Sequence, residues 1–196
     1  MKRWVVTGPA GAGKSVLCGF LARGGAAILD GDRLGHEILA RPEIAGAVAA
    51  EFGSLVIRDG SVDRAILGRL VFGDRSALER LNDITHGPLS DLVAEKLNDV
   101  QKSGRHRLAV LEAAVYFLLP PVPGVELVIT VTASDTTREK RLRDFAGLDR
   151  ETARSRIRAQ RPLEDGWARA DIVLVNEGPL GSLGVEAAAL LARLDD

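Results

Sequence analysis

Residues 8–15 read Gly8-Pro9-Ala10-Gly11-Ala12-Gly13-Lys14-Ser15, which fits the pattern G-x-x-x-x-G-K-[ST]. An apolar run at residues 4–6 precedes the stretch and predicts a buried strand, and residues 16–22 follow it with the apolar spacing of a helix. This order of strand, loop and helix distinguishes a functional pattern from a chance Gly-rich turn. The sequence therefore predicts a phosphate-binding loop inside an α/β fold.

Each residue type in this loop fits a separate task. The glycines allow backbone N–H groups to turn inward around phosphate oxygens, and the helix that begins near Lys14 adds its positive end. Lys14 is predicted to reach the β- and γ-phosphates, and the Ser15 hydroxyl to enter the shell of a Mg²⁺ ion. Together they predict a site for a polyphosphate and its magnesium.

Composition narrows the class of protein. The chain has 196 residues, a formal net charge of −1 and one cysteine, Cys18. The length fits one domain with a helical addition, and the charge gives no basic field that would favour nucleic acid. A single cysteine excludes an internal disulfide, and its predicted role is core packing. No apolar run is long enough to span a bilayer, so we expect a cytoplasmic protein without a membrane partner.

Two aspartates follow the second apolar run. Residues 26–29 predict a strand that ends in Asp30-Gly31-Asp32. Strands of an open α/β sheet present their carboxyl ends at the edge where ligands bind, and residues two apart in an extended segment face the same side. We therefore predict that Asp30 and Asp32 face the phosphates and that Asp32 is catalytic. The alternative is that one of them only caps the next helix.

The middle of the chain is predominantly helical. Apolar spacing predicts helices at residues 34–50, 65–72, 76–83 and 89–102, separated by Gly53, Asp59-Gly60, Gly73 and Gly87-Pro88. We interpret residues 34–103 as an inserted helical part that forms a wall of the second-substrate site. Strand character returns at residues 107–111 and ends at Glu112, which is either a ligand in the Mg²⁺ shell or a surface carboxylate without function.

The last third predicts a lid and the end of the sheet. A strand at residues 125–131 is followed by Ser134 as an N-cap and by helices at residues 135–143 and 149–161, while residues 171–176 and 179–194 predict a last strand and a closing helix. The two helices in the middle carry Arg138, Lys140, Arg141, Arg143, Arg150, Arg154, Arg156, Arg158 and Arg161. We predict a basic lid over about residues 135–165, and a core of residues 1–33, 104–134 and 170–196. Most of these basic residues are expected to be solvated partners of acidic residues, and one to three to contact phosphate.

These pieces, in this order, resemble the dephospho-coenzyme A kinase family. The resemblance rests on the loop, the Asp30-Gly31-Asp32 step, Phe52-Gly53, the run 60–67 leading to Val71-Phe72, residues 78–86, Gln160 and residues 170–176. It implies a P-loop kinase fold with a mostly parallel sheet. It also implies ATP-dependent phosphorylation of the ribose 3′-hydroxyl of dephospho-coenzyme A, the last step of coenzyme A synthesis, in a monomer or small homo-oligomer.

The resemblance also assigns residues. It implies Asp32 as catalytic base, and Asp63, Arg64 and His86 as contacts of the acceptor. It implies ATP contacts by the whole loop, Val16 and Asn176. The sequence departs from the family at Val16, where Thr is usual, at residues 114–118, where a glutamate is missing, and at Phe145, where a lid arginine is usual. Arg141 or Arg143 is the substitute for that arginine, and we assign the catalytic role to Arg141.

Other readings remain open. A nucleoside monophosphate kinase would share the loop and the lid, but the Asp30-Gly31-Asp32 step and the Asp63-Arg64 run favour the coenzyme A precursor. A GTPase-like switch would use Asp32-Arg33-Leu34-Gly35 as D-x-x-G, yet Asn176 is followed by Glu177-Gly178 and not by the rest of a guanine-reading motif. A nonenzymatic nucleotide-binding module conflicts with the presence of Lys14, Ser15 and Asp32.

Overall fold

The computed structural model describes residues 1–71 and 73–194, together with all their side chains except that of Leu180. Phe72, which the sequence assigned to a helix end and to a family motif, therefore lies outside the described residues. The chain divides into two compact units. The first unit comprises Met1–Asp30, Lys96–Leu118 and Pro123–Asp196, and the second comprises Gly31–Glu95 and Leu119–Val122.

The first unit is built on a five-stranded sheet whose order is β2-β5-β1-β6-β7. Its strands are β1 (Lys2–Thr7), β2 (Ala27–Asp30), β5 (Leu108–Glu112), β6 (Leu127–Thr132) and β7 (Ile172–Val175), and every neighbouring pair is parallel. The predicted parallel sheet is thus confirmed. Glu112 is in register with both Val6 and Asp30, so the ends of three strands meet at one edge. This is the edge at which the phosphate-binding loop leaves β1.

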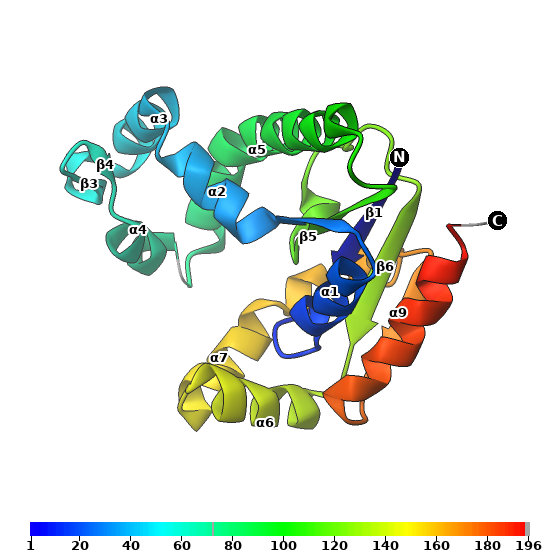
Figure 1. Cartoon of the computed structure of the whole chain (residues 1–196). Coiled ribbons are helices and arrows are strands. Elements are labelled where there is room, and N and C mark those ends of the chain that lie inside the picture. The colour runs from blue at the N-terminus through cyan, green and yellow to red at the C-terminus, as the bar shows by residue number, and fades with distance from the viewer. Residues whose placement is uncertain (72, 195–196) are drawn as a thin grey trace. The chain divides into compact units, whose positions relative to one another are not determined.

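Helices α1 (Lys14–Arg23) and α9 (Leu183–Ala192) pack against one face of this sheet (Figure 1). Their contact with it is a cluster of buried side chains that includes Trp4, Val6, Leu17, Leu21, Val110, Ile129, Val131, Leu183 and Leu190. Alternate residues of a strand face opposite sides, so Thr130 points away from Ile129 and Val131. There its hydroxyl donates to the Trp167 carbonyl at 2.8 Å, which attaches α8 (Glu164–Trp167) to the second face.

The predicted lid is a helical hairpin of α6 (Asp135–Ala146) and α7 (Arg150–Ala159), followed by the short 3₁₀ turn η3 (Arg161–Leu163). The Ser134 hydroxyl accepts a hydrogen bond from the Thr137 N–H, as the sequence predicted for an N-cap, and Asp149 caps α7 in the same way. Gly147 ends α6 in the left-handed conformation. Leu142, Ala153 and Ile157 form the apolar contact between the two helices.

Two of the basic residues on the lid pair with a lid carboxylate. Glu139 accepts hydrogen bonds from Arg150 at 3.0 Å and from Arg154 at 2.8 Å, and these bonds hold its pKa below the usual range. The side chain of Arg150 is 65% exposed and that of Arg154 49%. The prediction that most basic residues on these helices are solvated partners of acidic residues is therefore confirmed for this pair.

The second unit is helical, with one small hairpin. Its elements are α2 (Gly31–Leu39), α3 (Pro42–Phe52), η1 (Ser54–Val56), β3 (Ile57–Arg58), β4 (Ser61–Val62), α4 (Arg64–Val71) and the first part of α5 (Arg75–Ser103). The 3₁₀ turn η2 (Tyr116–Leu118) belongs to the first unit. The predicted helix 34–50 is two helices, because Pro42 occupies the first turn of α3. The hairpin was missed: Asp59-Gly60 is its two-residue turn, with positive φ at both residues, and was read only as a break between helices.

The predicted break at Gly87-Pro88 was wrong. Helix α5 continues through both residues. A proline inside a helix removes one backbone hydrogen bond and costs about 3 kcal/mol or more. Here the residues that follow it are buried, with Leu92 and Val93 each 1% exposed, and the Ser90 hydroxyl donates to the Pro120 carbonyl at 3.2 Å. Packing therefore overrides the local preference. Across the described residues, we find no helix of a length and apolarity that would allow it to cross a membrane.

Candidate active site

The phosphate-binding loop occupies the space between the end of β1 and the start of α1, and its shape requires glycine. Gly8 has φ +126°, and a Cβ there would lie 2.1 Å from the Val131 carbonyl oxygen. Gly11 has φ +79°, and a Cβ there would lie 2.9 Å from the Arg138 carbonyl oxygen. Both positions combine a conformation that side chains disfavour with a close approach of backbone from another element. The loop is therefore held between β6 and α6.

The structure brings Ser15 and Glu112 together, as the predicted magnesium site requires. The Ser15 hydroxyl donates to Glu112 Oε1 at 2.6 Å, and Asp30 is the register partner of Glu112 on the next strand. Hydroxyl and carboxylate oxygens are ligands that Mg²⁺ accepts, usually one or two of them beside waters and substrate phosphates. No group of three or more His, Cys, Asp or Glu side chains among residues 1–71 and 73–194 could by itself hold a metal. The residues thus fit an ion shared with a phosphate.

Lys14 and Cys18 lie on the first turns of α1. The Lys14 ammonium donates to the Pro9 carbonyl at 3.1 Å, across the mouth of the loop. Cys18 is 2% exposed, and its burial, together with the negative charge of Glu112, raises the pKa of its thiol far above the usual range. The thiol therefore stays protonated and packs in the core, as the sequence predicted.

Asn176 and Arg141 support the loop from behind. Asn176 is 2% exposed and its side-chain amide donates to the Ala12 carbonyl at 2.7 Å. The Arg141 guanidinium donates to the carbonyls of Ala12 at 3.3 Å, Asn176 at 3.0 Å and Gly178 at 2.8 Å. Both side chains therefore contact the loop through its carbonyl groups, and the N–H of Gly13, in the same peptide group as the Ala12 carbonyl, points the other way. The phosphate contact assigned to Arg141 stays a prediction.

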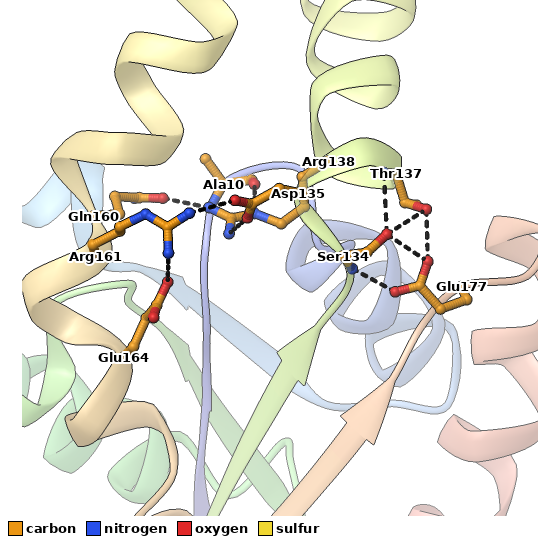
Figure 2. Close-up of polar contacts among 9 residues, drawn as sticks. All are labelled: Ala10, Ser134, Asp135, Thr137, Arg138, Gln160, Arg161, Glu164 and Glu177. Atoms are coloured by element: carbon orange, nitrogen blue, oxygen red, sulfur yellow. Dashed lines mark hydrogen bonds and ion pairs between the residues drawn. The ribbon is translucent and has the colours of Figure 1, made fainter.

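Arg138 and Gln160 also contact the loop, at Ala10 (Figure 2). Arg138 Nε donates to the Ala10 carbonyl at 3.0 Å, and Gln160 Oε1 accepts from the Ala10 N–H at 2.8 Å. Arg138 is 3% exposed; burial lowers the pKa of its guanidinium, and the neighbouring Asp135 opposes that shift. Sequence reasoning did not separate Arg138 from the other basic residues of the lid, because its partner lies 128 positions away in the chain.

Glu177 is a further residue that the sequence did not indicate. Its carboxylate accepts hydrogen bonds from the Ser134 N–H and hydroxyl and from the Thr137 hydroxyl, the last at 2.6 Å (Figure 2). These bonds hold the pKa of Glu177 below its usual range. A carboxylate at the start of α6 also stabilises the positive end of that helix. Glu177 thus links the turn after β7 to the beginning of the lid through hydrogen bonds.

The predicted acceptor residues belong to the second unit, and the structure corrects the reasoning for Asp32. Asp32 lies in the first turn of α2, which begins at Gly31 directly after β2 ends at Asp30. The two aspartates are therefore not on one extended segment, and their spacing of two does not place them on one side. Asp32 is exposed. Its acidic charge at a helix N-terminus is favourable in itself.

Asp63 and Arg64 lie at the start of α4, and His86 lies on α5. Asp63 Oδ1 accepts from the N–H groups of Ala65 at 2.9 Å and Ile66 at 3.0 Å, so Asp63 caps α4, and these bonds lower the pKa of its carboxyl. Arg64 is the exposed first residue of α4. His86 is half-buried inside α5, one residue before the helix break that was wrongly predicted at Gly87-Pro88. Their contact with an acceptor stays a prediction.

Comparison with known proteins identifies the family. The sequence model of the dephospho-CoA kinase family matches residues 4–181. A dephospho-CoA kinase of Moorella thermoacetica is 38% identical over 178 residues, which cover 89% of this chain and 84% of that protein. The chain belongs to the dephospho-CoA kinase family. The match contains the phosphate-binding loop, Asp32, Glu112 and the two lid helices.

Solved structures agree with the fold of this family. A crystal structure of TT1252 from Thermus thermophilus superposes with a TM-score of 0.77 at 32% identity, covering 98% of this chain and 97% of that one. A dephospho-CoA kinase from Campylobacter jejuni superposes with a TM-score of 0.69 at 21% identity, covering 99% and 98%. The predicted P-loop kinase fold is thus confirmed.

Proposed function

We propose that this protein transfers the γ-phosphoryl group of ATP to the ribose 3′-hydroxyl of dephospho-coenzyme A, which gives ADP and coenzyme A. The observation that carries the proposal is the family match over residues 4–181, which includes an intact phosphate-binding loop. The loop has the shape that the reaction needs. Its Ala10 and Ala12 carbonyls accept hydrogen bonds from Arg138, Arg141 and Asn176. The N–H groups of Gly11 and Gly13, in the same peptide groups, point the other way, where they would bind phosphate oxygens.

The loop residues divide the work on ATP. Lys14 exchanges its bond to the Pro9 carbonyl for the β- and γ-phosphates, where a compact cation offsets developing charge. Ser15 and Glu112, already bonded at 2.6 Å, would hold Mg²⁺ through the hydroxyl and through the carboxylate or its waters. When bound, Mg²⁺ supplies charge neutralisation between the β- and γ-phosphates.

Asp32 is the proposed catalytic base. A carboxylate within hydrogen-bonding reach of the attacking hydroxyl orients it and accepts its proton as the phosphoryl group arrives. Asp32 is exposed in the first turn of α2, two residues after Asp30, at which β2 ends as the register partner of Glu112. Arg64 and His86 would contact the acceptor, and Asp63 would help indirectly by fixing the start of α4. A cytoplasmic location and the monomer or small homo-oligomer stay predictions of the sequence.

The experiment is a coupled assay of ADP release with purified protein, ATP and Mg²⁺. Turnover should require dephospho-coenzyme A, and phosphorus NMR of the product should locate the new phosphate on the ribose 3′-oxygen. Equal turnover with AMP as acceptor would instead support a nucleoside monophosphate kinase. Asp32→Asn should reduce kcat by about 10² to 10⁴-fold without changing ATP affinity. Asp91→Asn, on an exposed aspartate of α5, is the matched control.

A further inference from the structure

The lid contacts the N–H, the carbonyl and the methyl group of Ala10 in the phosphate-binding loop. Its N–H donates to Gln160 at the end of α7, and its carbonyl accepts from Arg138 on α6. Its methyl group packs against the apolar cluster formed by Leu142, Ala153 and Ile157, between the two lid helices. No sequence motif requires such contacts at this position, where the loop pattern allows any residue. The lid and the loop therefore meet at one residue.

The polar contacts form a closed ring, which we call the Ala10 clasp and define as Ala10, Asp135, Arg138, Gln160 and Arg161 (Figure 2). Asp135 accepts from Arg138 at 3.1 Å through one oxygen and from Arg161 at 2.8 Å through the other. Arg161 is the chain neighbour of Gln160, which closes the ring. The clasp thus ties the beginning of α6, the end of α7 and the loop to one another.

A buried arginine in the clasp points to a role other than stabilising the fold. Arg138 is 3% exposed, and its Nη2 is a buried donor without a hydrogen-bond partner in the part of the chain that the structure describes. A buried unmet donor destabilises the folded protein, and an apolar side chain of similar length would avoid that cost. An apolar side chain could not, however, donate a hydrogen bond to the Ala10 carbonyl from a fixed direction.

We propose that Arg138 and Gln160 are positioning residues, which fix the two peptide groups on either side of Ala10 and so set the curvature of the phosphate-binding loop for ATP. The adjoining Gly11 has φ +79°, which glycine adopts without strain, and the Arg138 backbone lies so close that a Cβ at Gly11 would be 2.9 Å from its carbonyl oxygen. The inference rests on the proposed binding of ATP at this loop.

The test uses Gln160→Leu, which removes the acceptor oxygen, and Arg138→Met, which removes the donors at similar length. The control is Arg158→Met, on an exposed arginine of the same α7. Each variant is measured for hydrogen–deuterium exchange of the loop, for the dissociation constant of ATP without acceptor, and for the KM of each substrate. In both clasp variants the loop should exchange faster and ATP affinity should fall about tenfold. The KM of dephospho-coenzyme A should stay within about twofold of wild type.

A second variant separates positioning from packing. Gln160→Glu keeps an acceptor for the Ala10 N–H, so its loop should exchange as slowly as that of the wild type. The proposal would be overturned if the loop exchanged equally fast in Gln160→Leu and wild type. It would also be overturned if Gln160→Leu and Gln160→Glu increased the exchange rate of the loop equally. If Arg138→Met does not fold, the Gln160 pair decides alone. Loop exchange needs no turnover, so an inactive wild-type protein would refute the kinase assignment and leave the clasp to be judged by exchange.

Discussion

Substitution of Gly8 by alanine should be among the most damaging single changes in the loop. Gly8 is buried and has φ +126°, a conformation that costs a non-glycine residue about 1–3 kcal/mol. The added Cβ would lie 2.1 Å from the Val131 carbonyl oxygen, which is fixed in β6, and such overpacking costs about another 1–3 kcal/mol. The expected loss of unfolding free energy is therefore about 4 kcal/mol.

The matched control is Gly19→Ala on the adjoining helix α1. Gly19 lies inside the helix, and an added Cβ meets no atom within 4 Å. This variant should be more stable than wild type by about 0.5–1 kcal/mol, because alanine loses less conformational freedom in a helix. Urea denaturation of the three proteins measures the difference, and Tm should fall by about 8–16 °C for Gly8→Ala. A loss below about 1 kcal/mol would refute the argument from close backbone approach.

Three further predictions concern other contacts of the first unit. Arg141→Met should lower the unfolding free energy, measured by urea denaturation, by about 2 kcal/mol, because a charged donor to several carbonyls is lost. The control is Arg143→Met at an exposed position, whose unfolding free energy should match that of the wild type within about 0.5 kcal/mol. Iodoacetamide at pH 8.5 should alkylate Cys18 far more slowly in the native protein than in urea, and equal rates would contradict its burial. The folded pKa of Glu177 lies below its unfolded value, so its contribution to stability is present above about pH 4.3 and is lost as pH falls through the folded pKa. Urea titrations from pH 7 to 3 should show a shallower decline for Glu177→Gln, and identical slopes would count against this linkage.

The phosphate-binding loop and the parallel sheet could be predicted because their signals are local. Gly8 and the residues after it allow few conformations, and the buried runs that end at Asp30 and Glu112 place those residues at one edge of any parallel sheet. The Ser15–Glu112 contact follows from the same rule. Such features depend on dihedral preference and on the rule that parallel strands present their carboxyl ends at one edge, and neither requires knowledge of which distant side chains are in contact.

One error arose where packing overrode local preference. Pro88 is a strong helix breaker, yet α5 continues through it because the side chains that follow are buried. The spacing of Asp30 and Asp32 was read as extended, but α2 begins at Gly31, so the two residues belong to different elements. Arg138 gave no signal either, since a buried arginine and a solvated arginine are the same letter until its partner at Ala10 is known.

The contacts at Ala10 and Ala12 show why the motif alone does not make the site. A phosphate is bound tightly by N–H groups only if they already point inward, since ordering them on binding would consume the affinity gained. The direction of these groups is set by what holds the carbonyls on the other side of the same peptides. Those partners, Arg138, Arg141 and Asn176, all come from the last third of the chain. The anion site near the amino terminus is therefore complete only once α6 and β7 have folded against it, which couples phosphate binding to the whole first unit.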